Sequence, residues 1–375
     1  MMRTFCADRA SRGRGVLSFV LLAGAGVWAG CSEAAQPGPS GDDDIKNLAI
    51  DVPTTGRAFV ELTTPAAAKV EGDGSTSSAW DMAFEGYNVF TNGGLSGPGE
   101  AGALGPYAPE IFDTGVDPGS PILTRDAIGG AFLLWYGYDY TNPAHVLFSR
   151  YHVFGVKDGD RLWKVQVLSY YGDVEGAPVS AMYRLRYAEL TPDGALATQE
   201  VSNLDGTAGG ATGSEESPSE CLDLGTGARV MLSPAEAVKS SAWHLCFRRE
   251  VISVNGELGG PRGVSAVDLH GAETPFEAVD KLEARSAESE LGRFEAATFE
   301  ALSDPKLAYR GDRVVSIFAD QWVDPKASPP GPLPGTWVVL AADGDRRFMV
   351  SFTRFEGPSG GTPGRVIARV RPVKK

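Results

Sequence analysis

The chain has 375 residues, enough for two or three average domains. Its content of 42% hydrophobic and 22% charged residues excludes a mostly disordered chain and a multi-pass membrane protein. The formal net charge of -14 argues against a nucleic-acid partner, because an acidic surface repels phosphate groups. The 47 glycines and 25 prolines indicate many turns between short strands, and four cysteines with four histidines leave little room for a structural zinc site.

Residues 1–30 have the composition of an export signal. A basic stretch with four arginines precedes the apolar residues 15–27, which are too few to span a bilayer as a helix. Cys31 then follows Ala29-Gly30, which resembles the lipobox of bacterial lipoproteins. This resemblance implies lipidation of Cys31 and, with Ser32 next to it, an anchor in the outer membrane or at the cell surface. A plain secretory signal is the alternative.

Residues 31–52 are rich in Pro, Gly, Ser and Asp and are interpreted as a flexible tether. Because the signal carries four Arg and one Asp, its net charge is +3. The exported chain therefore carries a net charge of -17.

Two diverged copies of one domain follow the tether. Ser-Ser-Ala-Trp occurs at 77–80 and 240–243, and an Asn-Gly pair follows each Trp at 92–93 and 255–256. Asp-Gly-Asp-Arg occurs at 158–161 and 343–346, and a Thr-Gly pair at 55–56 resembles one at 226–227. The order of these matches predicts copies over 53–192 and 221–375, joined by a Gly/Ser-rich linker over 193–220.

The copies are predicted to be all-β, as two tandem antiparallel β-sandwich-like modules. Apolar and polar residues alternate over 80–85, as in a half-buried strand, and Lys157-Asp158-Gly159-Asp160 is a strong hairpin signal between two apolar runs. Residues 274–302 contain good helix formers, so we expect one or two helices inserted into the second copy.

Cys221 and Cys246 are expected to form a disulfide. Export places them in an oxidising compartment, and one strand-like run between them allows them to lie on adjacent strands. Two free thiols are the alternative.

The first copy resembles the HmuY-like family of haem-binding surface lipoproteins. The similarity rests on Trp80-Asp81-x-Ala83-Phe84, the Thr-Asn-Gly-Gly-x-Ser-Gly run at 91–97, Trp135-Tyr136-x-Tyr138, and the hairpin at 158–159 with its following strand. The second copy is a weaker match, without the Trp-Tyr-x-Tyr segment. The resemblance implies an all-β fold that holds haem between hairpin extensions, with two His or Met side chains on the iron.

His145 and then His152 are the candidate iron ligands, and Tyr136, Tyr138 and Tyr140 are the candidate aromatic binding residues. His145 follows a turn-rich segment, where an ordinary loop histidine is the alternative. The spacing of seven places His145 and His152 on opposite faces of a continuous strand.

Three functional hypotheses stay open at this stage. The leading one is an exported lipoprotein that binds haem or a related tetrapyrrole. The second is a module of the same fold that has lost haem and binds a protein or carbohydrate, and in the third the second copy only packs on the first. An enzyme is not expected, because no nucleophile elbow, zinc motif, P-loop or dinucleotide fingerprint occurs.

Overall fold

The computed structural model describes residues 44–119, 123–139, 146–209, 214, 216–319, 321–324 and 327–374. The described chain is mostly antiparallel strands with a few short helices, so the all-β fold is confirmed. Two groups of sheets account for most of the strands.

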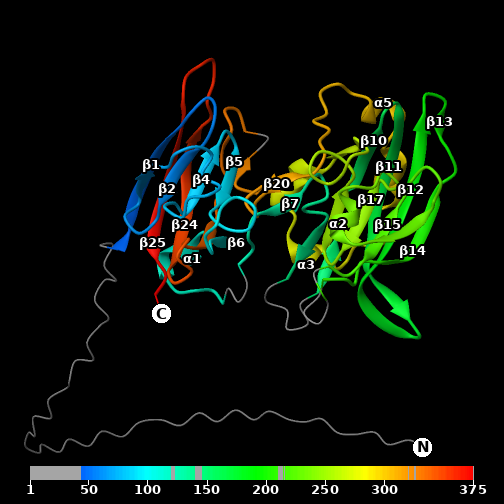
Figure 1. Ribbon diagram of the computed structural model, residues 1–375, viewed down its shortest axis with the longest axis horizontal. Coiled ribbons are helices and arrows are strands. Elements are labelled where there is room, and N and C mark those ends of the chain that lie inside the picture. The colour runs from blue at the N-terminus through cyan, green and yellow to red at the C-terminus, as the bar shows by residue number, and fades with distance from the viewer. Residues whose placement is uncertain are drawn as a thin grey trace, which may run out of the picture. The chain divides into compact units, whose positions relative to one another are not determined.

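The first group, here called the N/C assembly, joins the two ends of the described chain. Its strands are β1 (Lys46–Val52), β2 (Ala58–Glu61), β3 (Ala66–Ala68), β4 (Met82–Glu85), β5 (Asn88–Thr91), β6 (Gly102–Tyr107), β23 (Thr336–Leu340), β24 (Arg347–Glu356) and β25 (Gly364–Pro372). One sheet has the order β1-β25-β24-β23-β6 and the other β3-β2-β4-β5. The blue strand β1 therefore lies beside the red strand β25 (Figure 1).

The second group, here called the central assembly, uses the middle of the chain. Its strands are β10 (Val153–Asp158), β11 (Arg161–Val174), β12 (Ala177–Thr191), β13 (Gly194–Ala195), β14 (Gln199–Asp205), β15 (Ser219–Leu222), β16 (Arg229–Leu232), β17 (Leu245–Arg248), β18 (Val251–Val254) and β19 (Ser265–Asp268). One sheet has the order β13-β12-β11-β10-β19, with β14 also paired to β12, and the other has the order β16-β15-β17-β18.

Short elements connect or cover these sheets. They are α1 (Glu110–Thr114), β7 (Ala127–Gly129), β8 (Tyr136–Tyr138), β9 (Leu147–Ser149), α2 (Pro234–Ala237), the 3-10 helix η2 (Gly271–Phe276), α3 (Val279–Leu282), α4 (Leu291–Ala296), α5 (Phe299–Leu302), β20 (Arg313–Val315), β21 (Val323–Asp324) and β22 (Gly331–Pro332). The predicted helical content over 274–302 is thus present, but as several helices of four to six residues instead of one or two helices.

The two assemblies have equivalent sheets but exchange halves of the chain. β1–β6 in the N/C assembly correspond in order and pairing to β14–β19 in the central assembly, and β23–β25 correspond to β10–β12. Each assembly therefore combines the first half of one sequence copy with the second half of the other. The chain passes from one assembly to the other at β7 and again at β20. These two strands pair with each other, with Ile128 opposite Val314.

Each assembly encloses its own core between its two sheets. In the N/C assembly, β1 and β2 contribute Ile50 and Val60, which meet Val350 of β24 and Val366 of β25. In the central assembly, Val165 of β11 and Leu185 of β12 belong to the same buried cluster as Leu222 and Phe247. Since each core needs strands from both copies, the exchange of halves is part of the hydrophobic packing.

The repeated Trp and Asn-Gly pairs make the same contacts in both assemblies. The side-chain amide of Asn92 donates to the carbonyl oxygen of Trp80 at 2.7 Å, and that of Asn255 donates to Trp243 at 2.9 Å. A Cβ on Gly93 would lie 1.9 Å from the carbonyl oxygen of Ala101, so only glycine fits there. The repeat therefore preserves one buried hydrogen-bonded corner.

Buried aspartates hold the crossing segments to these corners. Asp126, just before β7, accepts the backbone N–H of Thr91, and Asp312, just before β20, accepts that of Val254. Burial raises the pKa of Asp126 to about 6 and that of Asp312 to about 7. The two carboxyls occupy equivalent places and fix where the chain leaves one assembly.

Two expected connecting segments contain strands. β1 lies within the predicted tether 31–52 and β14 within the predicted linker 193–220. In β1 the alternating Leu48, Ile50 and Val52 are buried against β25, a period-2 signal that the polar composition of the segment obscured. The remainder of the tether up to residue 43, the export signal and Cys31 lie outside the described residues.

Two finer sequence interpretations are wrong. The Thr-Gly pair at 226–227 precedes β16, whereas the one at 55–56 precedes β2, whose equivalent is β15. Trp80 packs with Phe59 and Ala83, not with Met82 and Phe84 as the alternation indicated. The chain bends as it enters β4, so the strand period does not extend back to Trp80.

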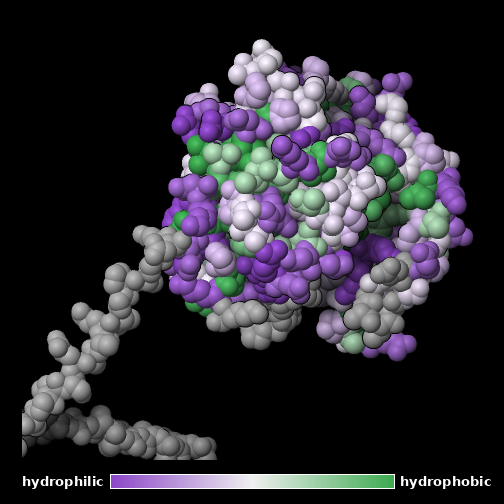
Figure 2. Space-filling view, turned by 60° about the vertical axis from the view of Figure 1, so that its left-hand side comes forward, coloured by the Kyte–Doolittle hydropathy of each residue, from purple (hydrophilic) through white to green (hydrophobic). Residues whose placement is uncertain are grey.

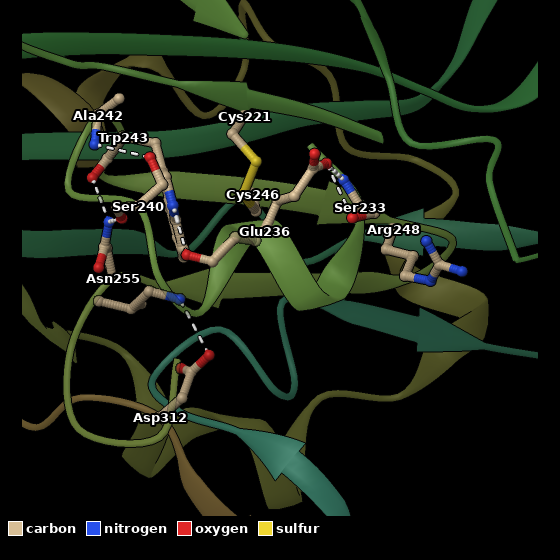
Figure 3. Close-up of a disulfide and its surroundings, with 12 residues drawn as sticks. Cys221, Ser233, Glu236, Ser240, Ala242, Trp243, Cys246, Arg248, Asn255 and Asp312 are labelled. Atoms are coloured by element: carbon tan, nitrogen blue, oxygen red, sulfur yellow. Dashed lines mark hydrogen bonds between the residues drawn. A yellow bond between two sulfur atoms is a disulfide. The ribbon is translucent and has the colours of Figure 1, made fainter. Parts of the chain in front are cut away.

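The predicted disulfide is present between Cys221 of β15 and Cys246 of β17. These residues are directly opposite each other, with a Cα–Cα distance of 4.0 Å, and they pack against Trp243 (Figure 3). In the N/C assembly the equivalent pair is Phe59 and Ala83, and Phe59 contacts Trp80 at a ring distance of 5.2 Å. A disulfide and an aromatic ring thus cover equivalent tryptophans.

Engineered disulfides test the exchange of halves. Ala49 lies opposite Ile367 in β1 and β25, so the double variant Ala49→Cys/Ile367→Cys is expected to form an intramolecular cross-link on oxidation. Peptide mass spectrometry without reductant identifies the linked peptides. In the matched control, Ala49→Cys/Arg184→Cys, the second cysteine lies on β12, which would neighbour β1 only if each copy folded separately. A cross-link in the control and not in the first variant would contradict the exchange.

The native disulfide is expected to stabilise the central assembly. Replacing Cys221 and Cys246 together by alanine should lower the free energy of unfolding by about 3 kcal/mol, because the cross-link restricts the unfolded chain. Urea denaturation measures this, and the parent chain under reducing conditions should show a similar loss. Equal stability of oxidised and reduced parent protein would refute the expectation.

Candidate functional site

The predicted haem-site residues divide into those that the structure describes and those that it does not. His145 and Tyr140 lie outside the described residues. Tyr136 and Tyr138 lie on β8, which pairs with β9, and both side chains are half-buried. Tyr136 contacts the ring of Trp135 at 5.1 Å, and burial raises the pKa of Tyr138. These two tyrosines therefore belong partly to the packing of the β8–β9 hairpin.

His152 is fully buried and both its ring nitrogens face carboxylates. Nδ1 lies 2.8 Å from Oδ2 of Asp268, and Nε2 lies 3.0 Å from Oε2 of Glu277. In this arrangement neither nitrogen is open to an iron atom, so the geometry does not offer His152 as a haem ligand. Its predicted partner His145 lies outside the described residues.

His152 belongs to a buried ionic cluster that attaches the helical insert to the central assembly. Glu277, just after η2, also accepts hydrogen bonds from Arg150 at 2.9 Å and from Arg285 at 2.6 Å. Arg285 in turn donates to the carbonyl oxygen of Arg150 at 2.8 Å. The cluster thus connects the segment between β9 and β10 to residues 277–285 of the insert.

The charges in this cluster shift one another's pKa values. Burial lowers the pKa of His152, but the hydrogen bonds to Asp268 and Glu277 outweigh that effect and raise it overall. For Glu277, burial opposes ionisation, yet His152, Arg150 and Arg285 lower its pKa to about 2. The cluster is therefore most stable with Glu277 ionised and His152 protonated.

The other two described histidines also serve the fold. His244 is fully buried, its Nδ1 accepts the backbone N–H of Leu224 at 3.0 Å, and burial followed by the charge of Arg262 lowers its pKa to about 4. Nδ1 of His270 accepts the backbone N–H of Val153 at 3.2 Å, and burial lowers the pKa of His270. Both side chains are therefore used in hydrogen bonds of the fold.

A cleft of about 470 Å³, here called the seam cleft, lies where the chain crosses between the assemblies. Its walls come from β5, from the segment after β7, from β19 and η2, and from β20 and the segment after it. Apolar and aromatic side chains predominate, among them Phe90, Leu134, Val315 and Trp322, with Asp268 and Arg310 as charged members. This size and lining are typical of small-molecule sites.

The seam cleft was missed at the sequence level because its walls are distant in the chain. One lining residue, Trp322, belongs to a repeat that the sequence could have revealed. Its indole N–H donates to the carbonyl oxygen of Tyr87 at 2.9 Å, and the equivalent Trp135 donates to Glu250 at 2.7 Å. Both tryptophans follow a crossing strand and attach it to the β-turn of an opposite sheet, so Trp135 and Trp322 are a further repeated pair.

Three further findings concern the described residues and their surface. No three His, Cys, Asp or Glu side chains among them form a group that could hold a metal ion. Within the same residues, no helix has both the length and the apolar character needed to cross a bilayer. On the face drawn in Figure 2, hydrophobic residues form small separate groups among hydrophilic ones, an ordinary pattern for a protein surface.

Comparison with protein-family models finds no match for this chain, and comparison with curated proteins finds no similar sequence.

Removing the carboxylate at the centre of the ionic cluster should destabilise the fold in a pH-dependent way. Glu277→Gln leaves two arginines and His152 without their shared anion, at an expected cost of about 3 kcal/mol near neutral pH. The folded pKa of about 2 lies below the usual value of 4.5. The carboxylate therefore stabilises above about pH 4.5, and its contribution is lost as the pH falls towards 2.

Urea unfolding of Glu277→Gln and the parent chain between pH 7 and pH 3 measures this difference. The stability gap should narrow once the pH falls below about 4.5. The control is Glu283→Gln, since Glu283 is exposed on the same insert. A gap that stays constant over this pH range, or equal effects of the two variants, would argue against the cluster.

Proposed function

We propose that this protein is an exported, lipid-anchored ligand-binding protein of the HmuY-like type that takes a largely apolar small molecule into the seam cleft. The export signal and Cys31 in the sequence support the location, and the resemblance of the first copy supports the class of protein. The observation that carries the binding role is the cleft itself, with its volume of about 470 Å³ and its aromatic and aliphatic walls.

Haem or another tetrapyrrole is the ligand class that the resemblance implies. The three described histidines are used in hydrogen bonds of the fold, so we propose that the ligand is held by apolar contacts and not by His152, His244 or His270. A metal-free tetrapyrrole would then bind about as well as haem. Apolar burial of this kind contributes roughly 25 cal/mol per Å².

Haem binding through His145 is the second candidate. Tyr136 and Tyr138 of β8 lead directly into the segment 140–145, which ends at His145. Aromatic side chains would flank the porphyrin there while the imidazole ligates the iron. This candidate predicts a strong preference for haem over the metal-free ring.

Titration with haemin and with protoporphyrin IX distinguishes these two candidates. Soret absorption and porphyrin fluorescence report binding to the purified chain. Ala308→Trp should block the seam cleft, because Ala308 is an exposed lining residue, and should weaken both ligands roughly tenfold or more. Ala195→Trp, on exposed β13 away from the cleft, is the matched control and should bind as the parent does.

Each outcome assigns or removes one candidate. Binding of both ligands that is lost in Ala308→Trp and kept in His145→Ala supports the seam cleft. Haem binding lost only in His145→Ala supports the second candidate. Absence of binding for both ligands overturns the tetrapyrrole proposal.

A further inference from the structure

A second cleft, of about 480 Å³, opens in the N/C assembly beside Trp80. Its lining includes the carboxylates of Glu61, Asp81 and Asp343, the basic side chains of Lys69 and Arg346, and Ser78. Asp343 and Arg346 belong to the turn before β24 and form an ion pair with an Nη2–Oδ2 distance of 2.7 Å. The function proposed above makes no use of this acidic cleft.

The exchange of halves supplies an internal comparison for the acidic cleft. Asp81 occupies the place of His244 in the central assembly. The backbone N–H of Asp81 donates to Val60 at 2.7 Å, and that of His244 donates to Leu222 at 2.8 Å. The N–H of Leu62 donates to Oδ2 of Asp81, as the N–H of Leu224 donates to Nδ1 of His244.

The same register relates the other lining residues to residues of the central assembly. Because Phe59 of β2 corresponds to Cys221 of β15, Glu61 corresponds to Asp223. The repeated Asp-Gly-Asp-Arg turns relate Asp343 to Asp158, and the repeated Ser-Ser-Ala-Trp segments relate Ser78 to Ser241. Trp80 likewise corresponds to Trp243. Five lining positions of the acidic cleft thus have a counterpart in the central assembly.

In the central assembly a guanidinium group fills this place. Nε of Arg262 donates to Oδ2 of Asp158 at 2.9 Å, and Nη1 donates to Oδ2 of Asp223 at 2.6 Å. Nη1 also lies 3.2 Å from the carbonyl oxygen of Ser241. The counterparts of all three acceptor residues line the acidic cleft.

The N/C assembly lacks this arginine. Arg262 follows Asn255 by seven residues and its N–H donates to Oδ1 of Asn255 at 3.1 Å. Gly99 follows Asn92 by seven residues, and its N–H makes the same hydrogen bond at 3.2 Å. Gly99 therefore stands where the other assembly has Arg262, and the replacement of neutral His244 by Asp81 adds a carboxyl group. The change at Gly99 leaves Glu61 without the guanidinium group that Asp223 has. The carboxyl oxygens of Asp81, in contrast, both accept backbone N–H groups, Oδ1 from Ala342 and Oδ2 from Leu62.

We propose that the acidic cleft binds a guanidinium group from outside the chain, in the place that Arg262 occupies in the central assembly. Glu61 accepts from the guanidinium as Asp223 does, the carbonyl oxygen of Ser78 accepts as that of Ser241 does, and Trp80 forms one wall. The group comes either from a free arginine-like molecule or from an arginine side chain of a peptide. This site is separate from the seam cleft and does not depend on the function proposed for it.

Isothermal titration of the purified full chain with two matched probes tests the proposal. N-acetyl-arginine amide is expected to bind, whereas N-acetyl-citrulline amide, its uncharged isostere, should bind at least about tenfold more weakly, because one charge-assisted hydrogen-bond pair is lost. Free L-arginine is the third arm. Tighter binding of the amide than of the free amino acid indicates a peptide as the source, and the reverse indicates a free small molecule.

Two variants and a control locate the binding. Glu61→Gln should weaken the arginine probe about tenfold. Thr64→Arg, at an exposed lining residue, places a guanidinium on the chain itself and should abolish binding while keeping the unfolding transition of the parent. Glu110→Gln, an exposed carboxylate on α1, should change nothing. Equal binding of the arginine and citrulline probes, or unchanged binding in both cleft variants, would overturn the proposal.

Discussion

The pairing of β1 with β25, and of β12 with β14, is the constraint on which this structure depends. β1, before the first copy, pairs with β25 of the second copy, and β14, before the second copy, pairs with β12 of the first. Each pair satisfies backbone groups that β25 and β12 would otherwise expose. β1 pairs over seven residues, while its Leu48, Ile50 and Val52 complete the core beneath. Because each core takes strands from both copies, residues 43–375 form one compact unit.

The crossing also creates the features that bear on function. The seam cleft lies beside β7 and β20, where two segments leave their own half and pair with each other. The equivalence of the assemblies, in turn, identifies which positions have diverged. Phe59 replaces a disulfide partner, Asp81 replaces His244, and Gly99 replaces Arg262. Equivalent positions within one chain thus show where packing and charge differ between the two assemblies.

The central assembly neutralises its buried carboxylates internally, with Arg262 between Asp158 and Asp223 and with Arg150 and Arg285 on Glu277. The second of these clusters attaches the helical insert, which explains why an insert of single-turn helices keeps a defined position. Isolated helices of this length are not stable in water, so the ionic and apolar contacts must hold them.

Sequence patterns alone determined the all-β class, the repeated Trp and Asn-Gly corners, the hairpin at 158–161 and the Cys221–Cys246 pair. All of these depend on local alternation, turn chemistry or short spacing, which the chain carries in adjacent residues. The strands β1 and β14 were hidden, because edge strands with one exposed face have the polar composition of linkers. Only the tertiary structure decided which half pairs with which, since both copies offer chemically similar partner strands. It also decided that His152 faces two carboxylates, because Asp268 and Glu277 lie more than one hundred residues away in the chain.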